Sequence, residues 1–372
     1  PLPRYAAPVP PPESIAGLLV LLAAGALLLW AALVLWTAHR LTRPPRRTYG
    51  SAKARGWAGD PSELTPARAF EEWTLRSRGR DLPVWDIPGD EPAGPVVIFT
   101  HGWGDGRIHG LLRAPALIPH CSRLILWELP GHGDAPGACA LGVAEATDLR
   151  ALVEQVAGGA RDADGGTPAR GVVLYGFSLG AGVSIAAASG ASQNQPPRHR
   201  EHRENTDRPQ TLHMAAVIAE APYVLPPTPA RAVLELSAMP WRTNLLPALW
   251  LVGVSLAARG LLPWSEAVRA GWLRAGGSFD RARLARGLPC PLLVLHGERD
   301  EVCPLAEARE IVEAGGGATG AADSTASATL AIIPSAGHND VWLDDAARTA
   351  ASAALSTFFH PLRATPTPPP AR

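Results

Sequence analysis

The chain has 372 residues, of which 47 % are hydrophobic and 18 % charged, enough for one large domain with appendages. Its 34 basic and 34 acidic residues cancel, so the composition gives no sign of a nucleic-acid partner. The four cysteines contain no C-x-x-C pair and match the spacing of no metal or redox motif, so we expect reduced structural thiols and neither a metal ion nor a cofactor.

The first predicted element is a membrane helix over residues 15–38, IAGLLVLLAAGALLLWAALVLWTA, which contain no charge. As a helix this stretch spans about 36 Å, slightly more than a bilayer core of about 30 Å. A cleaved signal peptide would have a shorter apolar core and a basic start, whereas here the basic cluster follows the core: Arg40, Arg43, Arg46, Arg47, Lys53 and Arg55. We therefore favour an uncleaved, single-pass membrane anchor.

The charges that flank this helix predict its orientation. Only Arg4 precedes it, so the positive-inside rule places the N-terminus outside and everything after Ala38 in the cytoplasm. Residues 39–66 are interpreted as a basic juxtamembrane linker. The Pro-rich residues 1–14 and 361–372 are predicted to be disordered.

Residues 67–360 form the predicted soluble domain. A hairpin over residues 71–89 is expected to turn at Gly79-Arg80-Asp81. Apolar strands separated by helical stretches follow, at 96–100, 123–128, 172–176, 216–220, 292–296 and 330–334. This order predicts an α/β fold with a mostly parallel sheet covered by helices on both faces. Three polar low-complexity stretches are interpreted as solvated spacers away from the ligand-binding edge of the sheet: 158–170, 191–213 and 314–328.

The clearest motif is the sequence VVLYGFSLGAGVSIAAA at residues 172–188. It reads as a strand, then Gly176-Phe177-Ser178-Leu179-Gly180, then an Ala-rich helix, which is a G-x-S-x-G nucleophile elbow in the context the motif requires. The sharp turn presents Ser178 at a helix N-terminus, where an oxyanion can be stabilised. Ser178 is therefore a candidate nucleophile, and it needs a base with an orienting carboxylate.

With this elbow, about residues 70–360 resemble an α/β-hydrolase. In that family the oxyanion hole takes one backbone N–H from the residue after the nucleophile, here Leu179, and a second from the loop after the third strand. That loop contains HGWG at 101–104, so the resemblance assigns the second N–H to Trp103. The family order of serine, acid and histidine assigns the acid to Asp300 in LLVLHGERDEVCP and the base to His338 in LAIIPSAGHND.

Two other carboxylates are rivals for the acid. Glu220 ends the strand after the elbow, where some hydrolases carry their acid, and Asp340 lies two residues after His338. Asp300 is preferred because HGERD together with GHND matches the family pattern better. The remaining loop histidines close to strand ends are interpreted as structural: His101, His132 and His296.

An insertion at about residues 221–288 is expected to form a helical cap over the site, as in the family. Its apolar stretch 245–264 either buries its own helical faces or forms an acyl-chain pocket or membrane-dipping lid, and the sequence leaves both open. A second transmembrane span is not expected, since Pro247 and Arg259 bracket too short a run.

The resemblance is closest to membrane-anchored serine hydrolases of the Bem46-like and monoacylglycerol-lipase-like kind. It implies hydrolysis of a carboxylic ester or thioester, small-molecule or lipid and lipophilic in character, through an acyl-enzyme on Ser178. An acyltransferase, an aminopeptidase and a non-catalytic membrane-tethered binding protein remain alternatives. Acyl length and oligomeric state stay open.

Overall fold

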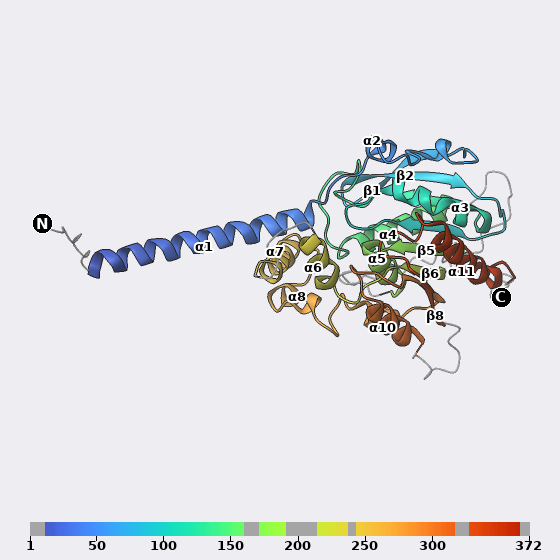
Figure 1. The fold of residues 1–372 in the computed structure, drawn as a ribbon. Helices are drawn as coiled ribbons and strands as arrows, with labels where there is room; N and C mark the ends of the chain where they lie inside the picture. Colours follow the sequence, from blue (N-terminus) through green and yellow to red (C-terminus); the bar gives the residue numbers. More distant parts are fainter. Residues whose placement is uncertain (1–11, 160–170, 191–213, 237–242, 317–326, 365–372) are drawn as a thin grey trace, which may run out of the picture.

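The computed structural model describes residues 12–159, 171–190, 214–236, 243–316 and 327–364 (Figure 1). Of the three polar spacers, 191–213 lies wholly outside these residues and the other two lie mostly outside. The two ends predicted to be disordered are shorter than the sequence suggested. Residues 12–14 belong to α1 (Pro12–Thr42), and residues 361–364 belong to α11 (Asp345–Ala364). The remainder of both ends lies outside the described residues.

The centre of the molecule is an eight-stranded sheet in the order β1-β2-β4-β3-β5-β6-β7-β8. β1 and β2 pair antiparallel with each other and β2 pairs antiparallel with β4, whereas every other pair is parallel. The mostly parallel sheet predicted from the sequence is therefore confirmed. Its strands are β1 (Glu71–Ser77), β2 (Arg80–Pro88), β3 (Val96–Thr100), β4 (Arg123–Trp127), β5 (Val172–Phe177), β6 (Met214–Glu220), β7 (Leu292–Gly297) and β8 (Ala328–Ile333).

The β1–β2 hairpin turns slightly earlier than predicted. Ser77 pairs with Arg80, so the turn consists of Arg78 and Gly79, both with positive φ (48° and 74°). Two successive positive φ values are the requirement of a type I′ turn, whose twist matches that of the strands. The sequence placed the turn at residues 79–81 because Gly79 marks its end and not its start.

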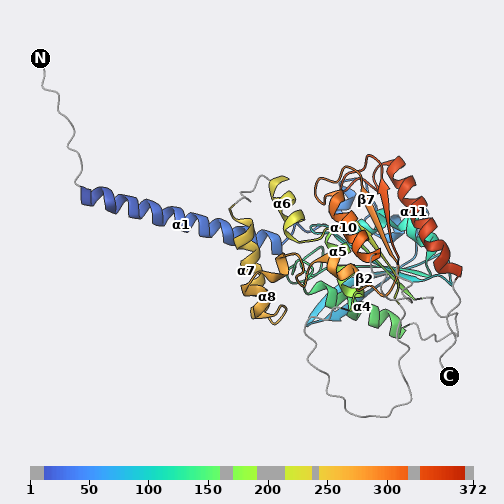
Figure 2. The same ribbon diagram turned by 90° about the horizontal axis from the view of Figure 1, so that it is seen from below.

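Helices cover both faces of the sheet (Figures 1 and 2). One face packs against α4 (Glu145–Gly159), α5 (Leu179–Ala188) and α10 (Leu305–Gly316), and its core also includes cap side chains. The other face packs against α3 (Ala114–Leu117), α11 and the short 3₁₀ helices η2 (Arg107–Leu112) and η3 (Ile118–His120). Because β3 and β5 are buried on both faces, they read as unbroken apolar runs in the sequence.

The segment between β6 and β7 forms a helical cap, as predicted. It contains α6 (Pro227–Leu236), α7 (Leu245–Ala258), α8 (Trp264–Val268), η4 (Gly271–Leu273) and α9 (Arg281–Ala285). Much of this apolar sequence is buried in the same core as the sheet face beneath it.

α1 is long and apolar enough over Ile15–Thr42 to cross a membrane, with a mean hydropathy of 2.8. The following residues differ from the predicted linker 39–66, because they pack onto the domain. Arg46 Nη1 donates to the carbonyls of Gly133 (2.7 Å) and Ala135 (2.9 Å), and Ala52 of α2 (Tyr49–Lys53) is buried. η1 (Pro61–Glu63) follows. A basic, Pro-containing composition is typical of linkers, and it does not reveal arginines that bind backbone carbonyls.

Candidate active site

Ser178 lies in a strained turn between β5 and α5. Its φ and ψ are 51° and −110°, a conformation that costs energy for a residue with a side chain. A Cβ on Gly176 would lie 2.1 Å from the Gly180 carbonyl oxygen, and one on Gly180 would lie 2.0 Å from the Thr100 carbonyl oxygen. The two motif glycines are therefore required by the close approach of the backbone.

The structure brings the three side chains that the sequence proposed as nucleophile, base and acid together. His338 Nε2 lies 3.1 Å from Ser178 Oγ, and His338 Nδ1 lies 2.7 Å from Asp300 Oδ2. The other carboxylate oxygen, Oδ1, accepts the backbone N–H groups of Val302 (2.9 Å) and Cys303 (2.7 Å). These contacts fix the carboxylate, so that Nδ1–H donates to it and Nε2 is left to accept the serine proton.

The two rival carboxylates are engaged elsewhere. Glu220 is buried and accepts four hydrogen bonds from three buried side chains at 2.7–3.0 Å: Arg113, Tyr175 and Trp342. Asp340 Oδ2 accepts from the backbone N–H of Gly337 at 3.2 Å, within its own loop. Within the described residues, neither carboxylate hydrogen-bonds His338, whereas that of Asp300 does.

The two residues whose amides are proposed to bind the oxyanion, Leu179 and Trp103, line the same pocket as Ser178. Leu179 is the first residue of α5, so its N–H has no intrahelical carbonyl to bind. This N–H lies at the positive end of the helix dipole. Trp103 lies in the loop after β3 and lines the same pocket as Ser178. Its indole Nε1 donates to the Leu41 carbonyl at 2.8 Å, which ties this loop to the end of α1.

The histidines that we interpreted as structural are all fully buried. His101 accepts the Leu129 N–H at 3.0 Å, and its ring packs edge-on against His132, with 4.9 Å between the centroids. His296 Nε2 binds the Cys303 carbonyl at 2.8 Å and thereby supports the loop that carries Asp300. Burial lowers the pKa of His132 and of His296, so both rings are held neutral.

A pocket of about 350 Å³ opens above Ser178 and His338. Its walls are mainly apolar, and three parts of the chain far from Ser178 in the sequence contribute to them: the Trp103 loop, the start of the cap, and the end of α1 with the residues that follow it. Leu41, Pro45 and Arg47 contribute the last of these walls. Sequence reasoning missed them, because nothing in their local pattern shows that the end of the apolar helix reaches the site.

Asp300, Cys303 and His338 are the described residues whose potential metal-ligating atoms cluster, within 4.8 Å of one another. Burial, followed by the charge of Asp300, raises the pKa of the Cys303 thiol well above its ordinary value. The thiol is therefore protonated, and Asp300 and His338 already bind each other. This chemistry fits a hydrogen-bonded relay better than a metal site.

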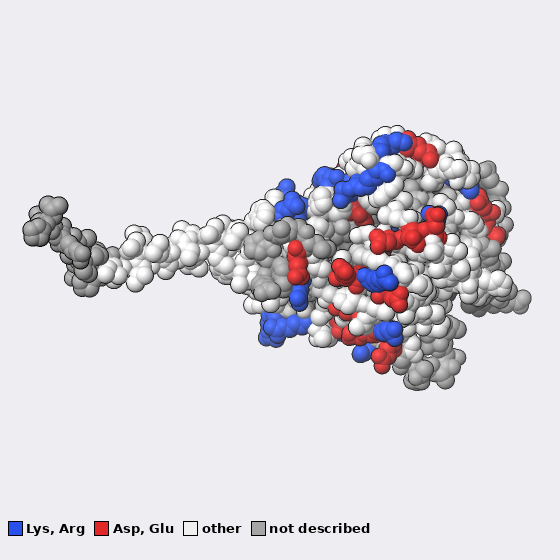
Figure 3. Space-filling model, viewed as in Figure 1, with Lys and Arg blue, Asp and Glu red and all other residues white. Residues whose placement is uncertain are grey.

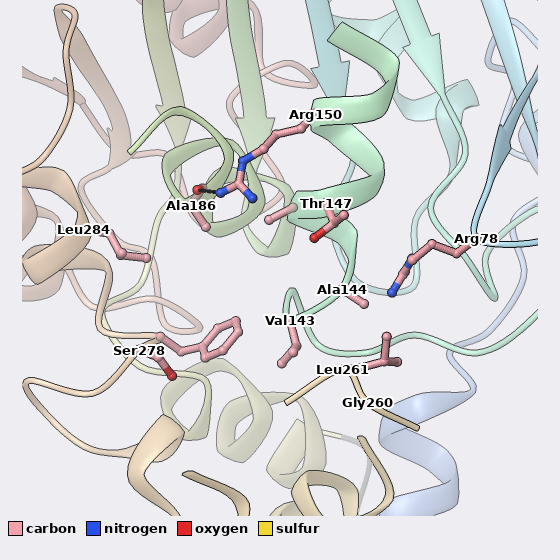
Figure 4. Close-up of a pocket in the computed structure, with 12 residues that line it drawn as sticks. Arg78, Val143, Ala144, Thr147, Arg150, Ala186, Gly260, Leu261, Ser278 and Leu284 are labelled. Atoms are coloured by element: carbon pink, nitrogen blue, oxygen red, sulfur yellow. Dashed lines mark hydrogen bonds between the residues drawn. The ribbon is translucent and has the colours of Figure 1, made fainter. Parts of the chain in front are cut away.

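A second, smaller cavity of about 160 Å³ lies between α4, α5 and the cap (Figure 4). Its lining includes Arg78, Thr147 and Ser278. Arg150 also lines the cavity, and its Nη2 donates to the Ala186 carbonyl at 2.7 Å. None of the three proposed catalytic side chains lines this cavity.

Comparison with known proteins agrees with this architecture. Residues 97–352 match the profile described as "Alpha/beta hydrolase family". Similar solved structures include an esterase from Pyrococcus furiosus, with 18 % identity, a TM-score of 0.55, and coverage of 86 % of this chain and 97 % of the other. Others are an esterase from Thermogutta terrifontis (19 % identity, TM-score 0.47, coverage 80 % and 99 %) and an acylaminoacyl peptidase from Pyrococcus horikoshii (15 % identity, TM-score 0.48, coverage 78 % and 41 %). At these identities the likeness concerns the fold alone. Among functionally curated protein sequences, no match was found.

Proposed function

The chain belongs to the alpha/beta hydrolase family, and we propose that it is a serine hydrolase that cleaves a lipophilic carboxylic ester or thioester through an acyl-enzyme on Ser178. The observation that carries the proposal is the continuous pair of contacts from Ser178 Oγ to His338 Nε2 (3.1 Å) and from His338 Nδ1 to Asp300 Oδ2 (2.7 Å). A serine hydroxyl becomes an effective nucleophile when a neutral imidazole can accept its proton.

The proposed reaction has two half-reactions. Ser178 Oγ attacks the substrate carbonyl carbon while His338 Nε2 takes the serine proton, and the negative oxygen is stabilised by the N–H groups of Leu179 and Trp103. His338 then passes the proton to the leaving alcohol or thiol, which departs as the acyl-enzyme forms. Water attacks the acyl-enzyme with His338 as base, so that the acid is released and Ser178 regains its proton. Asp300 stabilises the imidazolium in both halves.

The apolar pocket supports a lipophilic acyl group. Pro229, Ala230 and Val233 of α6 face the site together with Leu141 and Val302. Burying such a chain is favourable at about 0.8 kcal/mol per CH₂ group. Rates for p-nitrophenyl esters should therefore rise as the acyl chain lengthens beyond acetyl, and a preference for acetyl alone would contradict a lipophilic substrate.

The nucleophile is tested with a fluorescent fluorophosphonate probe, which reacts with activated serines. We expect the wild-type chain to be labelled and Ser178→Ala to remain unlabelled. Ser184→Ala is the matched control: Ser184 lies on α5, is buried, and its hydroxyl has no hydrogen-bond partner within the described residues, so labelling should be retained. A wild-type chain that takes no label would favour a non-catalytic binding protein.

We further propose that α1 anchors the domain in a membrane, with the domain on the cytoplasmic side. The support is the uncharged stretch 15–38 of α1 and the basic residues that follow it. A reporter that is active only in the cytoplasm should therefore be active when it is fused to the C-terminus. Activity outside the cytoplasm would reverse this topology.

A further inference from the structure

The exposed apolar side chains of the domain are concentrated on two cap helices. Outside α1, seven large apolar side chains are well exposed in the described residues, and four of them lie on α7 and α8: Leu246, Trp250, Trp264 and Val268. Each helix contributes a pair spaced by four residues, which places both members on one face. Trp250 Nε1 donates to the Val268 carbonyl at 3.2 Å, so the two pairs adjoin. We name these four residues the cap patch.

The cap patch lies beside the base of α1. α7 packs directly against α1. In both views, α7 and α8 lie at the end of the domain from which α1 projects (Figures 1 and 2). A membrane that surrounds α1 would therefore meet α7 and α8 first.

The length of α1 fixes how close that membrane must come. A helix that crosses the hydrocarbon core needs about 20 residues. Residues 15–30 of α1 are all exposed, and the first partly buried residue is Ala31. At 1.5 Å per residue, the exposed stretch covers only about 24 Å. Twenty residues counted from Ile15 reach Val34, which is the first buried side chain within residues 15–42. The hydrocarbon core must therefore end at the level where α1 is already packed onto the domain.

The polar groups around the patch suit a phospholipid surface. Arg259 and Arg269, which directly follow α7 and α8, are exposed. Figure 3 shows basic side chains, with acidic ones among them, at the end of the domain from which α1 projects. The carboxylate of α8, Glu266, is only partly exposed and accepts the Ser278 hydroxyl at 3.0 Å. Tryptophans flanked by arginines are typical of the membrane–water interface.

We propose that the cap patch is embedded in the lipid interface of the membrane that α1 crosses, so that the pocket above Ser178 opens to the bilayer and takes lipid acyl esters from it. The pocket lies between α1 and the cap, since Leu41 and Pro45 form one wall and Val233 of α6 another. An acyl chain could pass from the bilayer along these apolar residues without crossing water. The substrate half of this inference rests on the proposed function, whereas the membrane half does not.

The membrane half is tested with the full chain reconstituted in vesicles of phosphatidylcholine and phosphatidylglycerol. A nitrobenzoxadiazole fluorophore is attached to Leu246→Cys or Val268→Cys, since all four native cysteines are buried. Ala353→Cys on α11 is the control, because α11 lies at the far end of the domain and position 353 is exposed. A spin-labelled phospholipid should quench positions 246 and 268 strongly and position 353 weakly. Equal quenching at all three positions would overturn the proposal.

The substrate half is tested by placing charge in the patch. Leu246→Glu/Trp264→Glu should lower kcat/KM for a long-chain ester carried in the vesicles at least about tenfold, and leave hydrolysis of water-soluble p-nitrophenyl acetate unchanged. Ala353→Glu should alter neither. Equal hydrolysis of the vesicle ester by the double variant and the wild type would overturn the proposal. If the wild type cleaved neither ester in a Ser178-dependent way, the proposed function would fail, and the quenching result would still decide the membrane contact.

Discussion

Two carboxylates lie at the carboxyl ends of the neighbouring strands β6 and β7, and their hydrogen bonds separate their roles. Glu220 is the last residue of β6, and Asp300 lies in the loop that follows β7. Asp300 binds the imidazole of His338, whereas Glu220 neutralises the buried guanidinium of Arg113 at 2.7 and 2.9 Å. The sequence ranked Asp300 first from its motif. It could not reveal the partner of Glu220, because Arg113 is 107 residues away and lies in no recognisable pattern.

We predict opposite effects of removing the charge from these two carboxylates. Asp300→Asn should lower kcat by about 10⁴ and change the unfolding temperature little, because the amide holds the wrong tautomer of His338. Glu220→Gln should cost about 3 kcal/mol of unfolding free energy by leaving Arg113 unpaired, and should retain fluorophosphonate labelling below its unfolding temperature. Ester kinetics and thermal unfolding distinguish the two. If Glu220→Gln abolished turnover while the fold stayed intact, Glu220 and not Asp300 would be the acid that acts with His338.

A buried histidine gives the protein a pH-dependent stability. Burial, helped by the neighbouring His101 ring, holds the pKa of His132 well below its usual value, while an unfolded histidine titrates near 6.5. As the pH falls below about 6.5, the unfolded state takes up a proton that the folded state does not, so stability is lost. His132→Phe keeps a ring in place and removes this titration.

Between pH 7.5 and 5.5 the wild type should therefore lose about 1.4 kcal/mol relative to His132→Phe. The urea midpoints of both proteins in detergent, measured at the two pH values, give this difference. Because both proteins share every other titrating group, carboxylate effects cancel. A gap that does not change with pH would show that His132 takes up its proton over the same pH range in the folded and unfolded states.

At the scale of elements, the turn from β5 to α5 depends on backbone contacts that tolerate no side chain. The strand, the turn and the helix were all predictable, since β-branched, glycine and alanine residues follow one another in that order. The same holds for β3, predicted at 96–100 and found as Val96–Thr100. The hairpin turn was misplaced by one residue, because Arg78 adopts a positive φ that its side chain does not signal.

Gly180→Ala should destabilise the domain by about 3 kcal/mol, because its Cβ would meet the Thr100 carbonyl oxygen at 2.0 Å. That loss corresponds to a fall of roughly 10 °C in the unfolding temperature for a domain of this size. Gly50→Ala is the matched control, since Gly50 lies in α2 and its Cβ would meet nothing within 4 Å. Calorimetry in detergent compares the two, and an unchanged Tm for Gly180→Ala would mean that the turn is less tightly packed than described.

For the whole molecule, α1 is a part of the domain and not a detached tether. The sequence indicated a membrane helix from its apolar composition, but it also indicated a linker where the structure has a packed segment. Linker composition and packed structure are compatible here because Arg46 and Arg47 bind backbone carbonyls, which any sequence can offer. The contribution of Leu41 to the pocket wall could not be predicted either, because it depends on a contact between segments far apart in the chain.

Leu41→Ala should therefore cost about 2–5 kcal/mol of unfolding free energy, because Leu41 is only 2 % exposed. Leu27→Ala removes the same atoms from a position that is 62 % exposed, and should leave domain unfolding unchanged. Tryptophan fluorescence during thermal unfolding in detergent compares the variants. Equal unfolding temperatures would separate α1 from the domain.

The proposed chemistry predicts a covalent intermediate on one identifiable atom. Rapid acid quenching during hydrolysis of p-nitrophenyl butyrate, followed by peptide mass spectrometry, measures it. We expect the butyryl mass on the peptide that contains Ser178, formed within the first turnover and lost as product is released. Turnover with the acyl group on another residue, such as Cys303, or with no acyl-peptide at any time, would contradict a hydrolase that works through Ser178.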